Sequence, residues 1–164
     1  QDEEPSDEDA RRFDRRRKDK KVSNDEWVSP FDPDAKITKM KDGTTHLAYK
    51  AEHAVDLDTG VIVAARIHPA DQGDTRTLAA TLEQAEAMLD LVGLAPTPET
   101  PAEMIADKGY HSREGLKALE DSAWKSRISE KEPKAFARWH GDDAARRAVY
   151  NNRARLKRPA RLSS

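Results

Sequence analysis

Asp107 is the residue of this chain whose position most suggests chemistry. It follows three apolar residues and precedes a Lys-Gly-Tyr turn in the stretch EMIADKGYH, residues 103–111. This pattern predicts a buried strand that ends in a carboxylate, at the edge where open α/β sheets place their ligands. Carboxylate oxygens are ligands for Mg²⁺, but a catalytic site needs several of them. The alternative is that Asp107 only caps the turn by accepting hydrogen bonds from Gly109 or Tyr110.

Basic side chains gather near the C-terminus. From Lys134 onward there are nine Lys or Arg against two Asp, although the whole chain of 164 residues has a net charge of −2. Such clusters are suited to phosphate contacts, which position a protein on DNA without reading its sequence. A solvated tail is the competing interpretation. The candidates for phosphate contact are Lys108, which could equally pair with a nearby acid, and Arg146, Arg147, Arg153, Arg155, Lys157 and Arg158.

Composition excludes several other kinds of protein. Hydrophobic residues make up 36% of the chain and charged residues 37%, so only part of the chain is expected to build a core. No cysteine is present, which rules out disulfides and thiolate metal sites and fits a cytoplasmic location. No apolar run is long enough to cross a membrane. The five histidines show no helical metal-binding pair. His111 could touch a phosphate near Asp107, but a solvent-exposed turn histidine is the simpler interpretation.

The elements around Asp107 follow from periodicity. Residues 46–68 predict an antiparallel hairpin, because HLAYKAEHAVD alternates between polar and apolar residues and a turn and a β-branched run follow. Tyr49 and His53 fall on the expected inward face with Leu47, Ala51 and Val55. Lys50 and Glu52 fall on the outward face.

The spacing of apolar residues after the hairpin predicts helices that alternate with strands. Residues 75–92 form a helical apolar stripe, with Asp74 or Thr75 as its N-cap and Gly93 after its end. Further elements are expected at 103–107 (strand), 112–121 (helix), 124–129 (strand) and 142–156 (helix). This order favours an α/β fold with a mixed sheet flanked by helices. A right-handed crossover is expected if the strands at 61–68 and 103–107 are parallel neighbours.

The chain divides by composition into three parts. Residues 1–36 are a charged arm without useful periodicity, in which prolines discourage regular structure. Residues 37–133 hold the predicted core. Residues 134–164 are the arginine-rich segment.

Four stretches together resemble a known family. DPDAKITKMKDGTTHLAYKAEHAVDLDTGVIVA, ADQGDTRTL, IADKGYHS and AVYNNRARLK closely resemble the DDE transposases of bacterial insertion sequences, and the resemblance runs from about Arg11 to the C-terminus. It implies a ribonuclease-H-like fold. It also implies that three acids hold two Mg²⁺ (or Mn²⁺) ions for phosphodiester cleavage and DNA strand transfer, with Asp107 matching the second acid. The implied partners are transposon ends, target DNA and further copies of the intact protein.

The other two acids of the family pattern are not found. The first belongs on a strand before the charged arm, and Asp32 and Asp34 lie in a proline-broken segment that does not suit a central strand. The last belongs on a helix after the arginines, but no acid follows Asp143. Glu130 and Glu132 lie too early. The ribonuclease-H-like fold is therefore expected to be incomplete in this chain, and the fragment inactive alone.

Two other functions stay open at this point. One is a non-catalytic nucleic-acid-binding protein that uses the arginine-rich segment on a decayed nuclease-like scaffold. The other is an α/β interaction domain with neither activity. Steeply salt-dependent DNA binding without metal would favour the former over the latter.

Overall fold

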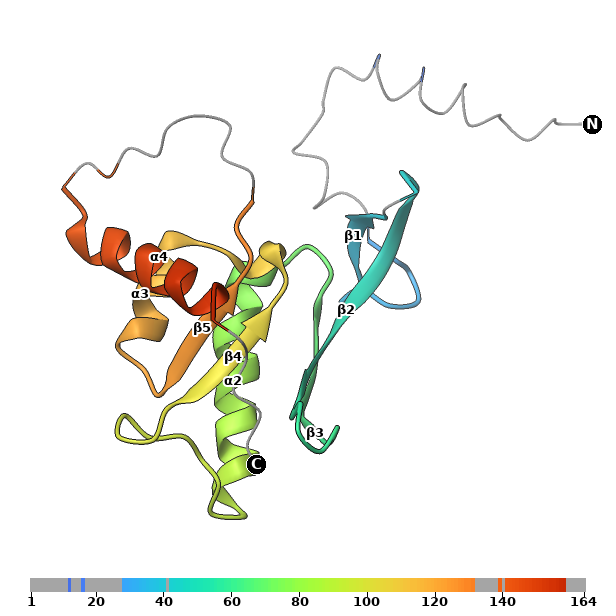
Figure 1. The fold of residues 1–164 in the computed structure, drawn as a ribbon. Helices are drawn as coiled ribbons and strands as arrows, with labels where there is room; N and C mark the ends of the chain where they lie inside the picture. Colours follow the sequence, from blue (N-terminus) through green and yellow to red (C-terminus); the bar gives the residue numbers. More distant parts are fainter. Residues whose placement is uncertain are drawn as a thin grey trace, which may run out of the picture. The chain divides into compact units, whose positions relative to one another are not determined.

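A computed structural model describes residues 12, 16, 28–40, 42–131, 139 and 141–158. The chain separates into two compact units, residues 1–48 and residues 49–164. Figure 1 shows the strands and helices with the labels used below. The expectations for Glu132, His140 and most of the charged arm fall outside the described residues.

The described part of the first unit is a short antiparallel pairing. Strand β1 (Lys36–Lys39) pairs with the beginning of β2 (Thr45–Val55), with Lys36 opposite Ala48 and Lys39 opposite Thr45. Between them the Asp42 carboxylate accepts a hydrogen bond from the Thr44 N–H at 2.9 Å, and Gly43 has φ of 90°. These contacts form a tight turn at residues 42–44. Strand β1 was not predicted from the sequence.

The second unit holds most of the regular structure. After residues 49–55 of β2, its elements in chain order are β3 (Ile62–Pro69), α2 (Asp74–Asp90), β4 (Ala102–Ala106), the 3₁₀ turn η1 (Lys108–Tyr110), α3 (Arg113–Glu120), β5 (Trp124–Ile128) and α4 (Asp143–Leu156). Mixed α/β structure is therefore confirmed. The predicted helices and strands from residue 74 onward are all present, with ends shifted by at most two residues.

Within this unit the strands form two separate pairings. β2 and β3 are an antiparallel hairpin with Lys50 opposite His68 and Glu52 opposite Arg66, which confirms the predicted hairpin. β4 and β5 are parallel, with Ala102 opposite Trp124, and α3 connects them. β3 and β4 are not hydrogen-bonded neighbours. The condition for the expected right-handed crossover between them is therefore not met.

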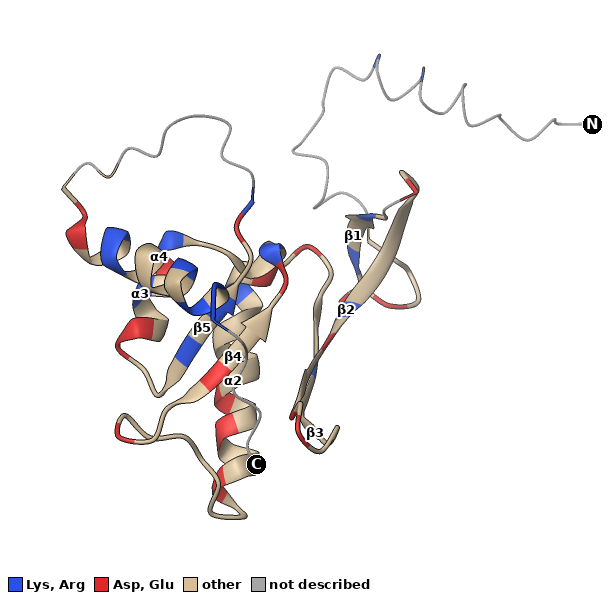
Figure 2. Ribbon diagram, in the orientation of Figure 1, with Lys and Arg blue, Asp and Glu red and all other residues tan. Residues whose placement is uncertain are grey.

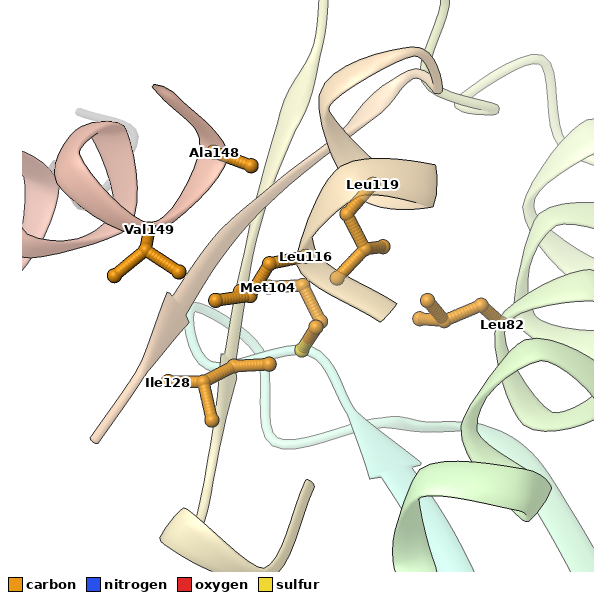
Figure 3. Close-up of a cluster of buried hydrophobic side chains, with 7 residues drawn as sticks. All are labelled: Leu82, Met104, Leu116, Leu119, Ile128, Ala148 and Val149. Atoms are coloured by element: carbon orange, nitrogen blue, oxygen red, sulfur yellow. The ribbon is translucent and has the colours of Figure 1, made fainter. Parts of the chain in front are cut away.

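The main core lies where helices meet the parallel pair. Its buried side chains, shown in Figure 3, are Leu82, Met104, Leu116, Leu119, Ile128, Ala148 and Val149. They come from α2, β4, α3, β5 and α4, so elements far apart in the sequence share one apolar cluster. Burial of these side chains is the main force that fixes β4, and with it the position of Asp107.

The hairpin faces the opposite way from the sequence prediction. Glu52 is only 5% exposed, whereas Tyr49 is 44% exposed and His53 is exposed. The predicted alternation was right, but the face taken as buried is the exposed one, and the face taken as exposed is buried. The charged face is the buried one because α2 offers hydroxyl groups there, which satisfy the Glu52 carboxylate.

Helix α2 also differs from its prediction. Gly73 is the N-cap and makes no side-chain cap hydrogen bond, and Asp74 is the first helical residue. The buried positions are Thr77, Thr81, Leu82 and Ala85, so the buried stripe includes threonines that an apolar pattern cannot detect. Gly93 has φ of 71°, as expected for the left-handed residue after a helix end. No described helix of the chain is both long and apolar enough to span a membrane.

Candidate functional site

Asp107 lies directly after β4 and is exposed. Its side chain accepts a hydrogen bond from the Lys108 N–H at 2.6 Å, so it is the N-cap of η1. Capping was expected, but from Gly109 or Tyr110 rather than from Lys108. One N–H donor leaves most of the carboxylate's acceptor capacity open. The carboxylate therefore caps the turn and is also accessible to a ligand.

The turn after Asp107 rests on a buried carboxylate. Glu52 of β2 accepts hydrogen bonds from Tyr110 and Thr81, and from the Thr77 hydroxyl at 3.0 Å. The Lys50 ammonium lies 3.5 Å from Glu52 Oε1, and His68 Nε2 lies 3.3 Å from Glu52 Oε2. We call Lys50, Glu52, Thr77, Thr81 and Tyr110 the Glu52 cluster.

Electrostatics in the Glu52 cluster favour a charged glutamate. Burial raises the pKa of Glu52, but hydrogen bonds from Thr81, Tyr110 and Thr77 and the charge of Lys50 outweigh burial, so its pKa is below the usual value. Burial also raises the pKa of Tyr110, as do its hydrogen bond to Glu52 and the charges of Glu52, Asp74 and Asp107. Tyr110 thus remains a hydrogen-bond donor over the whole physiological pH range.

A second contact holds the same turn. Lys50 donates to Asp74 Oδ1 and to the Thr77 hydroxyl at 3.0 Å. The Asp74 carboxylate lies against Gly109, where a Cβ atom would overlap it. Glycine therefore follows Lys108 because the chain must pass close to Asp74, not because of an unusual φ angle.

His111 and Glu130 form a separate group beyond the turn. The side chain of His111 is 15% exposed and its Nε2 lies 3.6 Å from Glu130 Oε1, while Arg153 Nε donates to Glu130 Oε2 at 2.9 Å. Burial lowers the pKa of His111, and the Glu130 charge opposes this effect. The expectation of a solvent-exposed turn histidine was therefore wrong, because β5 and α4 bring Glu130 and Arg153 over it.

Basic residues lie along α4 (blue in Figure 2) and directly after it, and their side chains have different partners. Arg155 donates to Glu120 and, at 3.2 Å, to the carbonyl of Ser126, and its side chain is 16% exposed. Arg146 pairs with Asp143 at 3.1 Å on the surface. Arg147 and Lys157, by contrast, are exposed and make no ion pair with any described acid. Arg158 accepts a hydrogen bond at its carbonyl from Arg127, and its own side chain is exposed.

Lys108 is exposed beside Asp107 and makes no ion pair within the described part of the chain. Its alternative role, pairing with a nearby acid, therefore has no support among those residues. Its side chain is therefore exposed at the surface next to Asp107.

A divalent metal fits this site only in part. Asp107 is an accessible oxygen donor of the kind that Mg²⁺ takes. Among the described residues, however, no group of three or more His, Asp or Glu is close enough to hold a metal ion. The described residues thus supply one ligand and do not complete a metal centre by themselves.

The site thus presents an exposed acid at the carboxyl end of a strand in a mixed α/β fold. Comparison with protein-family models gives a match to the Transposase DDE domain over residues 9–163. The chain belongs to this family, so transposition-related DNA cutting and transfer is its enzyme class. DNA is the substrate of that class, which generally uses divalent metal ions. Comparison with curated proteins gave no match, and comparison with solved structures gave none either.

Sequence reasoning missed the Glu52 cluster. It placed Lys50 and Glu52 on the solvent side of the hairpin and treated Thr77 and Thr81 as ordinary helix residues. One signal was available, since Thr77 and Thr81 are four residues apart and therefore lie on the same helix face. A hydroxyl pair on the helix face that packs against a strand indicates a polar partner there.

Proposed function

We propose that this chain is part of the catalytic domain of a Mg²⁺-dependent DNA transposase, in which Asp107 is one of three acidic metal ligands. The observation that carries the proposal is the exposed Asp107 carboxylate at the end of β4, in a chain that belongs to the Transposase DDE domain family. A ribonuclease-H-like sheet is the corresponding fold. We propose that the other two acids are absent from this chain, whose described residues contain no complete acidic cluster.

In this proposal, Asp107 and the basic residues of the chain have different roles. Asp107 would be the residue of this chain that holds the ion, with a carboxylate that already accepts a hydrogen bond from the Lys108 N–H. A bound Mg²⁺ or Mn²⁺ would supply activation of a water or a DNA 3′-hydroxyl and charge stabilisation at the phosphodiester. Lys108 would contact a phosphate beside this site. Arg147 on α4, and Lys157 and Arg158 directly after it, would contact the DNA backbone, while Arg153 and Arg155 hold α4 to β5 and the residues that follow it.

Metal binding by the chain tests the role of Asp107. We expect Mn²⁺ to broaden the backbone NMR signals of residues 106–111 selectively, with weak affinity because a single carboxylate is present. Asp107→Asn should abolish the broadening. Asp121→Asn is the control, since Asp121 is an exposed C-cap residue of α3. Equal broadening in wild type and Asp107→Asn would contradict the proposal.

DNA cleavage tests the incompleteness of the site. The isolated chain is expected to show no Mg²⁺-dependent nicking of supercoiled DNA. Nicking that is lost in Asp107→Ala would show that the required acids are all present on this polypeptide, and would overturn that part of the proposal.

A further inference from the structure

Arginines and aromatic rings alternate along the surface where α3 packs against α4. The Arg113 guanidinium carbon lies 4.5 Å from the centre of the Trp139 ring. The Trp139 and Tyr150 ring centres are 6.4 Å apart, and the Arg153 guanidinium carbon lies 5.2 Å from the centre of the Tyr150 ring. We call Arg113, Trp139, Tyr150 and Arg153 the stacking row. All of its members are planar side chains, and the two arginines are cationic.

Contacts within the fold hold the stacking row in place. Trp139 packs against the main core, and its carbonyl accepts a hydrogen bond from the Asp142 N–H at 2.9 Å, at the start of α4. Arg153 Nε donates to Glu130 Oε2 at 2.9 Å. Tyr150 and Arg153 are three residues apart and lie on one face of α4. The planar groups are therefore ordered before a ligand arrives, so binding would immobilise few side chains.

The α4 end of the stacking row is open to solvent. Tyr150 is 55% exposed and the Arg153 side chain is 38% exposed. A planar group can therefore approach these side chains from outside. Nucleic-acid bases stack on aromatic rings and on guanidinium planes, and such stacking tolerates any base sequence. It requires unpaired bases, because the base faces of a duplex are already covered by neighbouring base pairs.

The same end of the stacking row is connected to the turn that carries Asp107. Glu130 links Arg153 to His111, whose Nε2 lies 3.6 Å from Glu130 Oε1. The His111 N–H in turn donates to the Lys108 carbonyl at 3.2 Å, at the end of η1. Because β4 and β5 are parallel, Asp107 and Glu130 both follow the carboxyl ends of neighbouring strands. The stacking row therefore meets the sheet at the edge where Asp107 lies.

We propose that the stacking row binds unpaired nucleotides of single-stranded DNA through their bases. The inference goes beyond the proposed function, because it requires neither a metal ion nor the Asp107 carboxylate. It also differs from the contacts proposed for Arg147, Lys157 and Arg158, which would hold the phosphates of duplex and single strands alike. Stacking of one base on a protein side chain typically changes affinity by about 5-fold or more.

The test compares two fluorescein-labelled oligonucleotides of equal length, one of thymidine and one with abasic sites at its central positions. Both present the same phosphates, so a difference in Kd reports contact with the bases. By anisotropy in EDTA, the wild-type chain should bind the thymidine oligonucleotide about 5-fold or more tightly. Tyr150→Leu should lose most of this preference, and Tyr150→Phe should keep it because the ring remains. Tyr49→Leu is the matched control and should also keep it, since Tyr49 is 44% exposed on β2.

Crosslinking locates the contact in the wild-type chain, without a variant. Iododeoxyuridine at the centre of the thymidine oligonucleotide should crosslink on irradiation to Tyr150 or Trp139, as identified by mass spectrometry of the peptides. Equal affinity of the wild type for the two oligonucleotides would overturn the inference. So would an unchanged preference in a folded Tyr150→Leu variant, or crosslinks confined to residues outside the stacking row. None of these outcomes depends on a metal ion at Asp107, so the proposed function stands or fails separately.

Discussion

Two carboxylates close to one turn have opposite surroundings. Asp107 is exposed and has one backbone donor, whereas Glu52 is buried and has three hydroxyl donors. A ligand for a metal must keep open acceptor capacity, and a residue that orients others must be fully satisfied. At the scale of single residues, the environment therefore leaves Asp107 open to a partner, whereas Glu52 is already satisfied by its neighbours.

Gly109 packs so closely against Asp74 that an added Cβ atom would overlap the Asp74 carboxylate. Gly109→Ala should lower the free energy of unfolding by about 1–3 kcal/mol, because the added methyl overlaps the Asp74 carboxylate and breaks its contact with Lys50. Urea unfolding measures the change. Asp74→Ala should remove the clash, so the double variant should lose less than the sum of the single variants. Strictly additive losses would contradict this explanation.

His111 should make stability depend on pH. Its folded pKa is lowered by burial, while the unfolded chain has the usual value of about 6.5. The unfolded state then binds more protons between these two values, so stability should fall as pH drops from about 7 through 6.5 to the folded pKa.

Unfolding measured across this pH range should therefore show a smaller slope for His111→Asn than for wild type. His53→Asn is the control, because His53 is exposed on the hairpin and should leave the slope unchanged. Identical slopes in His111→Asn and wild type would show that His111 does not contribute.

At the scale of elements, α4 is attached to β5 by side chains that imitate a neighbouring strand. Asn152 is fully buried, with its Oδ1 accepting from the Ile128 N–H at 2.9 Å and its Nδ2 donating to the Ile128 carbonyl at 2.8 Å. The end of β5 thus has its backbone groups satisfied by a helix. Arg155 adds a hydrogen bond to the Ser126 carbonyl on the same strand.

Asn152→Leu should therefore be strongly destabilising. It leaves two buried backbone groups without partners, each of which costs about 1–3 kcal/mol, so a loss of about 2–5 kcal/mol is expected in urea unfolding. Asn151→Ala is the neighbouring control. Asn151 is only partly buried and donates to Glu120 at 2.9 Å, so its loss should be about 1 kcal/mol or less. Similar losses in both variants would contradict the special role of Asn152.

At the scale of the whole molecule, acidic and basic regions are separated along the chain. The net charge of −2 does not predict DNA binding, but the segment from Lys134 onward is strongly basic. Within it, internal ion pairs neutralise part of the charge, and the exposed side chains of Arg147 and Lys157 are left for a partner.

Double-stranded DNA binding should therefore be metal-independent and steeply salt-dependent. Arg147→Ala with Lys157→Ala should reduce the slope of log affinity against log salt by about 2, because each phosphate contact contributes about 0.9. Fluorescence anisotropy between about 50 and 200 mM KCl measures it. Arg76→Ala, an exposed arginine on α2, is the matched control and should leave the slope unchanged. An unchanged slope in the double variant would show that Arg147 and Lys157 do not contact DNA.

Elements with strong local signals were predictable from the sequence. Ser112 caps α3 by accepting from the Gly115 N–H at 3.0 Å, and Asp142 caps α4 by accepting from the Ala145 N–H at 3.0 Å, each at the residue where the helix was predicted to begin. The strand before Asp107 was predicted for the same reason, since an apolar run and a following glycine are visible locally. The Glu52 cluster was not predictable in this way, because Glu52 is 25 to 58 residues away in sequence from the hydroxyl groups that donate to it.

The sequence by itself determined the order of elements, the family resemblance and the place of Asp107 at the end of a strand. These depend on residues near one another in the chain, where periodicity and capping act. Only the tertiary structure decided which face of the hairpin is buried, which arginines are already paired and what holds the Asp107 turn. These outcomes depend on hydrogen bonds and ion pairs between distant segments. The sequence around a polar side chain does not show whether a distant segment will supply its partner.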